Sequence, residues 1–174
     1  MVYCETIEES KIWVCPKAGV WKIICIGGGG AGAALGATSA FGTDGGTTSF
    51  GSYISANGGK NGKEYIGGNN PPLISEPYAG INGFNGASTY GVSSGNVVGC
   101  GYGGSGGATS TNLKYCCAGF PGEVKSTIVD IIEDTSIPCT IGTGGASAND
   151  NQNQQFAFPG KSGAIIVQYL GSEM

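Results

Sequence analysis

The sequence predicts an all-β chain, a β-sandwich that carries long, ordered glycine-rich loops. Segments rich in β-branched and aromatic residues lie toward both ends of the chain. No window of ten or more residues repeats apolar positions at helical spacing. Glycine makes up 35 of the 174 residues, and 28 of these lie between 27 and 122. At this length we expect a single domain over residues 1–174.

The first strands are expected within residues 11–26. Ile12-Trp13-Val14 precedes a turn at 16–19, and the apolar run 20–26 then ends at four glycines. This pattern predicts two strands joined by a short connection. Ahead of them, residues 1–10 form an acidic N-terminal segment, in which 3–10 is a candidate for contacts with a partner.

Further strands are expected at 47–56 and in the last part of the chain. In residues 47–56 the side chains alternate, which predicts one strand with Thr48, Phe50, Ser52 and Ile54 on a single face. The region 123–170 is expected to complete the sandwich with three strands, at 123–131, 137–141 and 163–170. The last of these is apolar enough to be central.

Residues 57–121 are predicted to be ordered glycine-rich excursions. Disordered linkers are poor in aromatic and β-branched residues, whereas both are scattered through this stretch. Paired glycines at 45, 58, 67, 103 and 106 would let backbones approach closely. Such segments are expected to be extended or polyproline-II runs, and neighbouring runs must satisfy their N–H and C=O groups because that helix has no internal hydrogen bonds.

Composition excludes several functions. Charged residues make up 11% of the chain and the net charge is −4, so no basic face is available for nucleic acid. Histidine is absent, which removes the usual general base and the commonest metal ligand. Seven cysteines without a C-x-x-C pair predict neither a zinc site nor a disulfide framework, but reduced thiols. We expect no metal and no cofactor.

Insertion into a membrane is not expected either. The chain has no run of 18 apolar residues, and its acidic first residues differ from the basic start of an export leader.

The segment Gly27–Gly32 supports the competing hypothesis of a nucleotide-binding enzyme. It fits G-x-G-x-x-G directly after an apolar strand, where such a turn can hold a pyrophosphate. The following residues, 33–42, contain two glycines and no amphipathic stripe, and no acidic residue follows at the spacing that ribose binding needs. A match by chance in a glycine-rich chain is the favoured interpretation.

Tyrosines in the glycine-rich loops are the candidate binding residues. Rigid aromatic rings and adaptable amides on loops are typical of recognition surfaces, and sugar binding uses the same groups. The candidates are Tyr65, Tyr78, Tyr90 and Tyr102, with several asparagines and Tyr115 nearby in sequence. An equally good alternative is that these rings pack between glycine runs.

The order of several segments resembles the glycine-rich domain of bacteriophage tail fibres and other virion appendages. The segments are 16–23, 26–30, 48–59, 101–107, 140–145 and 160–169, and they span nearly the whole chain. The resemblance implies a β-sandwich with glycine-rich loops, a non-enzymatic role and a place on the virion. Expected partners are other virion proteins and a glycan or protein of the host surface, with a capsid or tail decoration protein as the alternative.

Self-association is expected as well. Few charges cover the surface and the ordered glycines carry a large entropic cost, so the chain is expected to bury further area against copies of itself or a fixed partner. A trimer is favoured through the resemblance to fibre proteins alone.

Overall fold

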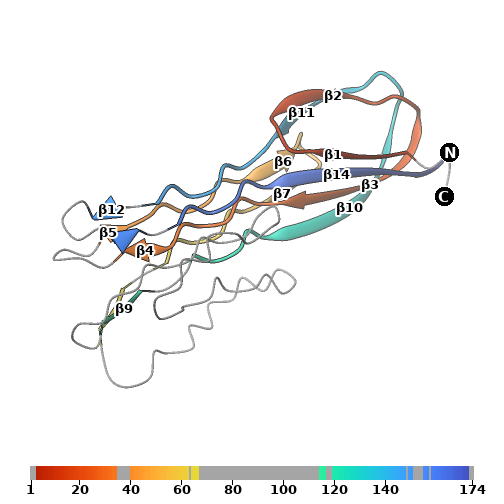
Figure 1. Cartoon of the computed structure of the whole chain (residues 1–174). Helices are drawn as coiled ribbons and strands as arrows, with labels where there is room; N and C mark the ends of the chain where they lie inside the picture. Colours follow the sequence, from red (N-terminus) through yellow and green to blue (C-terminus); the bar gives the residue numbers. More distant parts are fainter. Residues whose placement is uncertain are drawn as a thin grey trace.

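The computed structural model describes residues 3–34, 40–62, 64–66, 114–116, 119–147, 149–150, 155–156 and 158–172. This part of the chain is all-β, as predicted, and it is long in one direction (Figure 1). Two sheets lie at one end, extended glycine-rich runs follow, and three short two-stranded ribbons lie at the other end. The described residues include no helix that could cross a membrane.

The first sheet has four antiparallel strands in the order β1-β14-β3-β10. Their bounds are β1 Cys4–Ile7, β14 Ala164–Gly171, β3 Gly19–Ile26 and β10 Val124–Ile131. The prediction of a central last strand is confirmed, since β14 lies between β1 and β3.

The second sheet has the order β2-β11-β6-β7. Its strands are β2 Lys11–Val14, β11 Ser136–Thr140, β6 Thr48–Phe50 and β7 Ile54–Ala56. The two strands predicted within 11–26 are therefore present as β2 and β3, but they belong to different sheets. The chain crosses from one sheet to the other in the connection between them.

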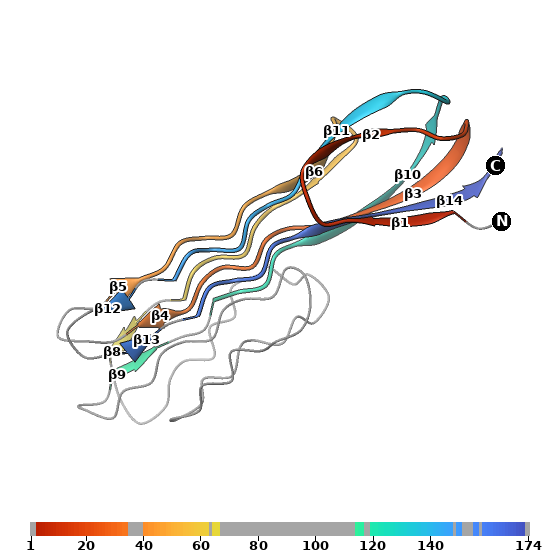
Figure 2. The ribbon, with the colours of Figure 1, turned by 45° about the horizontal axis from the view of Figure 1, so that its top comes forward.

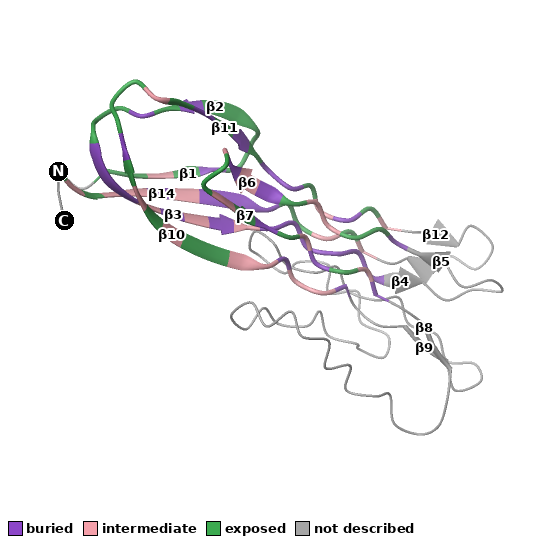
Figure 3. Cartoon of the chain, turned by 180° about the vertical axis from the view of Figure 1, so that it is seen from behind, coloured by how far each residue is buried: buried purple, intermediate pink, exposed green. Residues whose placement is uncertain are grey.

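The core lies between the two sheets and is built around aromatic rings. Trp21 of β3 is fully buried, and its ring contacts that of Trp13 of β2 edge to face, with the centroids 5.2 Å apart. Phe50 of β6 packs against Trp13 at 5.4 Å. Such pairs stabilise a core beyond the area that they bury. Figure 3 shows buried residues in the strands of both sheets and along the adjoining runs.

The arrangement of strands differs from the predicted one in three respects. The single strand expected at 47–56 is a hairpin, β6 and β7, because Gly51 adopts a positive φ of 51° and turns the chain. A strand that the sequence analysis did not predict, β1, covers the edge of β14. The three strands predicted within 123–170 are confirmed as β10, β11 and β14, but residues 142–146 and 158–163 between them leave the sandwich as extended glycine-rich runs.

Six such runs lie side by side beyond the sandwich (Figure 2). They comprise residues 27–32, 42–46, 57–62, 119–123, 142–146 and 158–163. They form three out-and-back pairs, and each pair leaves one sheet and returns to the other. Run 27–32 leaves β3 and run 42–46 returns to β6; the other pairs connect β7 to β10 and β11 to β14.

Short ribbons lie at the far ends of these pairs. Their strands are β4 Ala33–Ala34 with β5 Ala40–Phe41, β8 Glu64–Ile66 with β9 Lys114–Cys116, and β12 Asn149–Asp150 with β13 Gln155–Phe156. All three lie at the end of the molecule opposite the two chain termini (Figure 1).

Candidate functional site

Run 27–32 lies at the centre of the glycine-rich bundle, and its N–H groups donate in three directions that repeat every third residue. The N···O distances are 2.8 to 3.1 Å. Gly27 and Gly30 donate to run 119–123, Gly28 and Ala31 to run 42–46, and Gly29 and Gly32 to run 158–163. A polyproline-II helix has three residues per turn, which produces this threefold pattern.

The carbonyl groups of the same run accept hydrogen bonds from two further runs. Gly59 and Gly62 of run 57–62 donate to the oxygens of Gly28 and Ala31, each at 2.8 Å, and Gly145 donates to Gly29 at 2.8 Å. The prediction of extended runs held together by their neighbours is confirmed for the described residues. It was incomplete, because the runs also include 27–32, 142–146 and 158–163.

Glycine is required here because the backbones lie too close for a side chain. A Cβ on Gly58 would meet the carbonyl oxygen of Gly45, and one on Gly122 would meet that of Gly27. The paired glycines at 45 and 58 thus permit the close approach that the sequence predicted. The pairs at 67, 103 and 106 lie outside the described residues.

This packing bears on the nucleotide-binding hypothesis for Gly27–Gly32. All six N–H groups of that segment donate to other runs, so none is directed at a ligand. The residues that follow form the short strand β4 instead of the helix whose N-terminus would hold a pyrophosphate. The glycine motif therefore has a structural explanation in this chain.

Side chains fix the outer runs of the bundle against each other. The Asp44 carboxylate accepts from Lys60 Nζ and from the Asn61 N–H, both at 2.8 Å, and Asn61 Nδ2 donates to the Gly42 carbonyl at 2.7 Å. An exposed ion pair alone contributes little. The three bonds together set the register of run 57–62 against run 42–46.

A second carboxylate lies where the bundle joins the first sheet. Glu123 accepts from the Asn57 N–H at 2.9 Å and pairs with Lys125 Nζ at 3.1 Å. The bond from Asn57, with smaller help from Lys125, lowers the pKa of this carboxyl below its ordinary value. The Glu123 N–H donates in return to the Asn57 carbonyl, so the two runs are locked at this point.

The three ribbons at the far end form the candidate functional site, because the bundle holds all of them at one end. Tyr65 of β8 is the cross-strand partner of Tyr115 of β9, so two of the sequence-predicted tyrosines are brought together from positions far apart in the chain. Tyr78, Tyr90 and Tyr102 lie outside the described residues. Composition alone indicated these tyrosines, and no pattern in the sequence indicated that β4–β5 and β12–β13 would lie at the same end of the molecule as β8–β9 (Figure 2).

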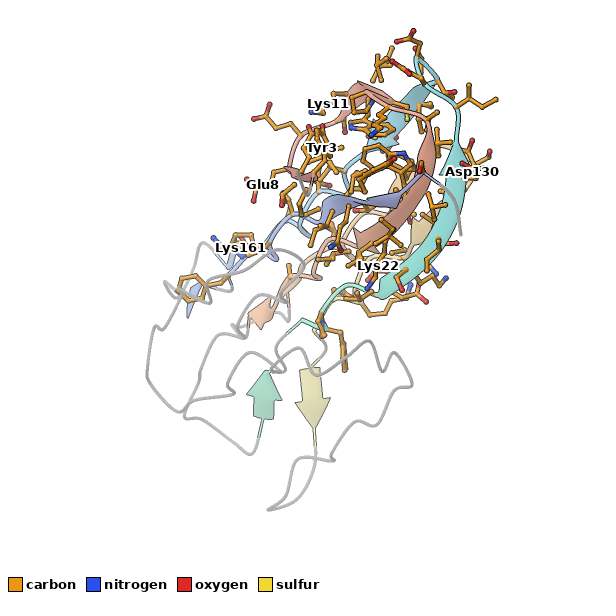
Figure 4. All side chains as sticks on the ribbon, turned by 90° about the vertical axis from the view of Figure 1, so that its right-hand side faces the viewer. Tyr3, Glu8, Lys11, Lys22, Asp130 and Lys161 are labelled. Carbon is orange, nitrogen blue, oxygen red and sulfur yellow. The ribbon has the colours of Figure 1, made fainter. Side chains whose placement is uncertain are left out.

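The opposite end of the molecule carries a polar cluster around Glu5. Its carboxylate accepts from the Tyr3 hydroxyl at 2.6 Å, from Trp13 Nε1 at 3.1 Å and from Lys11 Nζ. Tyr3 and Lys11 lie close together on this face (Figure 4). Partial burial acts to raise the pKa of Glu5, but these hydrogen bonds outweigh it and hold the pKa below its ordinary value. The cluster fastens β1 to β2 and so closes one side of the sandwich.

The thiols in the described residues are consistent with the predicted reduced state. Cys15, Cys25 and Cys139 are buried and free, and Cys4 is exposed and free. Burial raises the pKa of Cys25 to about 12 and that of Cys139 to about 11, so neither is a reactive thiolate near neutral pH. No group of metal-ligating side chains occurs among the described residues.

Comparisons with protein-family models, with curated proteins and with solved structures found no match to this chain.

Proposed function

We propose that this protein is a structural component of a bacteriophage virion, an appendage or fibre-tip protein that contacts the host surface. The observation that carries the proposal is the separation of the two ends of the molecule. The bundle holds three ribbons at one end, while the chain enters and leaves the fold at the other, where Tyr169 N–H donates to the Tyr3 carbonyl at 3.0 Å. The order of glycine-rich segments that resembles virion appendage proteins supports the same function.

The backbone of the bundle is suited to this task. Its hydrogen bonds run between chain segments in several directions, so the ribbons are held by cross-links over the whole length of the runs. A recognition surface loses less conformational entropy on binding when a rigid scaffold presents it. In this proposal the sandwich end joins the particle, and the ribbon end, which includes Tyr65 of β8, meets a glycan or protein of the host. The candidate residues Tyr78, Tyr90 and Tyr102, which lie outside the described residues, are proposed to take part in the same contact.

Immunogold electron microscopy of phage particles tests the position on the virion. Antibodies raised against the purified chain should label the outer end of a tail appendage. Labelling of the capsid or of the tail tube would instead support a decoration protein. Particles that carry no label, from a stock in which the gene is intact and expressed, would contradict a virion component of either kind.

An adsorption assay tests the contact with the host. Residues 72–108 are replaced in the phage genome by a short Gly-Ser linker, and assembly is checked by the amount of the protein on purified particles. We expect normal incorporation and adsorption as low as that of particles lacking the protein. The matched control is Thr143→Ala, an exposed position on the bundle, which should adsorb normally. Unchanged adsorption of the replaced variant would contradict host attachment through residues 72–108, which include Tyr78, Tyr90 and Tyr102.

A further inference from the structure

Run 57–62 contains two asparagine–glycine pairs, Asn57–Gly58 and Asn61–Gly62. In such a pair the backbone nitrogen of the glycine can attack the asparagine Cγ, because glycine has no side chain to hinder the approach. The N–Cγ bond forms, the bond from Cγ to Nδ2 breaks, and the side-chain nitrogen leaves as ammonia with the proton of the glycine N–H. Water then opens the resulting succinimide to aspartate or to isoaspartate.

The conformation of the run opposes this ring closure. In an extended polyproline-II run the nitrogen that follows each asparagine is rotated away from the Cγ of that asparagine, so the chain must first open locally. The rate of the reaction at each pair therefore depends on the free energy of that local opening. The two pairs differ in the hydrogen bonds that such an opening breaks.

At the second pair, three hydrogen bonds oppose the opening. The Gly62 N–H, which belongs to the attacking nitrogen, is buried and donates to the Ala31 carbonyl of the central run at 2.8 Å. Asn61 Nδ2, the leaving nitrogen, donates to the Gly42 carbonyl at 2.7 Å. The Asn61 N–H donates to the Asp44 carboxylate at 2.8 Å. Neighbouring runs thus hold both nitrogens that take part in the reaction.

At the first pair, the bonds of the asparagine backbone go to a single residue at the end of the bundle. The Asn57 N–H donates to the Glu123 carboxylate at 2.9 Å, and the Asn57 carbonyl accepts from the Glu123 N–H at 2.9 Å. Asn57 is exposed and directly follows β7, where the run begins. Opening can start at this end while Gly59 and Gly62 keep their bonds to the central run, so it costs less free energy than opening at the second pair.

We propose that Asn57 is a site of spontaneous deamidation, and that the hydrogen bonds around Asn61 protect the second pair from the same reaction. The reaction consumes water and yields ammonia and a carboxylate at position 57. Asp44 is a positioning residue in this assignment, because it holds the Asn61 N–H and takes no part in the chemistry.

Deamidation at Asn57 is expected to weaken the contact between run 57–62 and run 119–123. The new carboxylate arises next to that of Glu123, and like charges repel each other. Isoaspartate also adds one methylene group to the main chain ahead of Gly58, which already lies against the Gly45 carbonyl. The bundle of an aged molecule should therefore be less stable than that of a fresh one.

Peptide mapping by mass spectrometry tests the site. The purified full chain is incubated for several weeks in mildly alkaline buffer, and digested samples are analysed for conversion of each asparagine. Conversion at Asn57 should be about tenfold faster than at Asn61, which is the effect of one further hydrogen bond on the opening equilibrium. The asparagine–glycine pairs that begin at 82 and 85 lie outside the described residues, and fragment spectra distinguish them from these two.

A variant of Asp44 tests the protection of the second pair. Asp44→Ala removes the acceptor of the Asn61 N–H and should raise the conversion rate at Asn61 by about tenfold. Asp130→Ala, which removes an exposed carboxylate on β10 (Figure 4), is the matched control and should leave that rate unchanged. If Asp44→Ala does not fold, the wild-type rates at the two pairs decide the question.

A variant of Asn57 tests the consequence for stability. Asn57→Gln keeps the backbone bonds to Glu123, but a glutamine side chain is too long to form the succinimide. The melting temperature of the wild type should fall as Asn57 is converted, whereas that of Asn57→Gln should fall less over the same incubation.

Three outcomes would overturn the proposal. Conversion of Asn61 as fast as that of Asn57 means that the bonds of the second pair give no protection. An Asn57 that is still unmodified at the end of the incubation is not a deamidation site. An equal fall in the melting temperatures of the wild type and Asn57→Gln contradicts the effect on the bundle. None of these depends on whether the protein attaches to a host, so this test and that of the proposed function are independent.

Discussion

At the scale of single residues, a position in the bundle must be glycine where the carbonyl group of a neighbouring run leaves no room for a Cβ atom. At Gly142 a Cβ would meet the Gly46 carbonyl, whereas the next residue, Thr143, is exposed. The two neighbours therefore tolerate substitution very differently, although both lie in the same extended run.

Gly142→Ala is expected to lower the free energy of unfolding by about 2–3 kcal/mol, because the added methyl group meets backbone that has no room to move. Thr143→Ala should change it by less than about 0.5 kcal/mol. Urea denaturation followed by circular dichroism measures both. Equal stabilities of the two variants would show that the runs are packed less closely than described.

Glu5→Gln is expected to reduce the stability of the fold at neutral pH. It should also reduce the loss of stability that occurs as the pH is lowered. The pKa of Glu5 is lower in the folded protein than in the unfolded chain. The ionised carboxylate therefore stabilises the fold fully at pH values above the pKa of the unfolded chain, and this stabilisation is lost as the pH falls through the pKa of the folded protein. We expect a loss of about 1–2 kcal/mol at pH 7, since three donors lose a charged acceptor.

Melting temperatures at pH 7 and pH 3 provide the measurement for Glu5→Gln. The gap between the wild type and the variant should shrink at pH 3. Glu8→Gln, a change at an exposed position of the same segment, is the matched control and should follow the wild type. A difference in melting temperature that is the same at both pH values would contradict a stabilising role of the Glu5 charge.

Individual residues also show where sequence reasoning reached its limit. The close approach of paired glycines could be predicted at 45 and 58, because only a residue without a side chain permits it. The pairing of Gly58 with Gly45 could not be predicted, because it depends on how run 57–62 aligns with run 42–46. No local sequence pattern encodes that alignment. The register of Tyr65 with Tyr115 escaped prediction for the same reason.

At the scale of elements, Thr48 joins the second sheet to the bundle. It is fully buried in β6, and its Oγ1 accepts from the Gly142 N–H at 3.0 Å, at the point where β11 passes into run 142–146. Gly142 is the second residue beyond β11, so its N–H has no partner in the ladder of the sheet and the Thr48 hydroxyl accepts from it instead.

Thr48→Val keeps the shape of the side chain but leaves the Gly142 N–H buried without an acceptor. We expect a loss of about 1–3 kcal/mol, the cost of an unsatisfied buried donor. Thr48→Ser keeps the hydroxyl and should lose less than Thr48→Val, the missing methyl group being its own cost. Thermal unfolding of both variants measures the difference. A valine variant at least as stable as the serine variant would contradict this role of the hydroxyl.

Strands were predictable where apolar side chains alternate without interruption. In β3 the residues Trp21, Ile23 and Cys25 are buried and the residues between them are half-buried, so the pattern alone was sufficient. The alternation in 47–56 continued through Gly51, whose positive φ breaks the strand although the apolar pattern does not. Runs 142–146 and 158–163 have no periodic side chains, so their hydrogen bonds to other runs could not be read from the sequence.

At the scale of the whole molecule, the out-and-back pairs link the two sheets through the bundle. Each pair starts in one sheet and ends in the other, so loosening the bundle also loosens the connections of the sandwich. We therefore expect the sandwich and the bundle to unfold as one cooperative unit.

The two tryptophans allow a direct test, since Trp13 and Trp21 both lie in the sandwich core. The bundle substitution Gly142→Ala should lower the melting temperature measured by tryptophan fluorescence as much as that measured by far-UV circular dichroism. Calorimetry should show one transition for the wild type and one for the variant. A fluorescence transition that stays at the wild-type temperature would show that the bundle unfolds on its own.

The position of the ribbons at the far end has a consequence for the evolution of the sequence. Because no residue of the ribbon strands takes part in the hydrogen bonds between the described runs, a change of sequence or length at the tip of a ribbon leaves those bonds in place. The three tips can therefore diverge in sequence and length while the glycines stay fixed. For the same reason the ribbons can be exchanged for other sequences. A new binding specificity could then be introduced without redesigning the glycine-rich bundle.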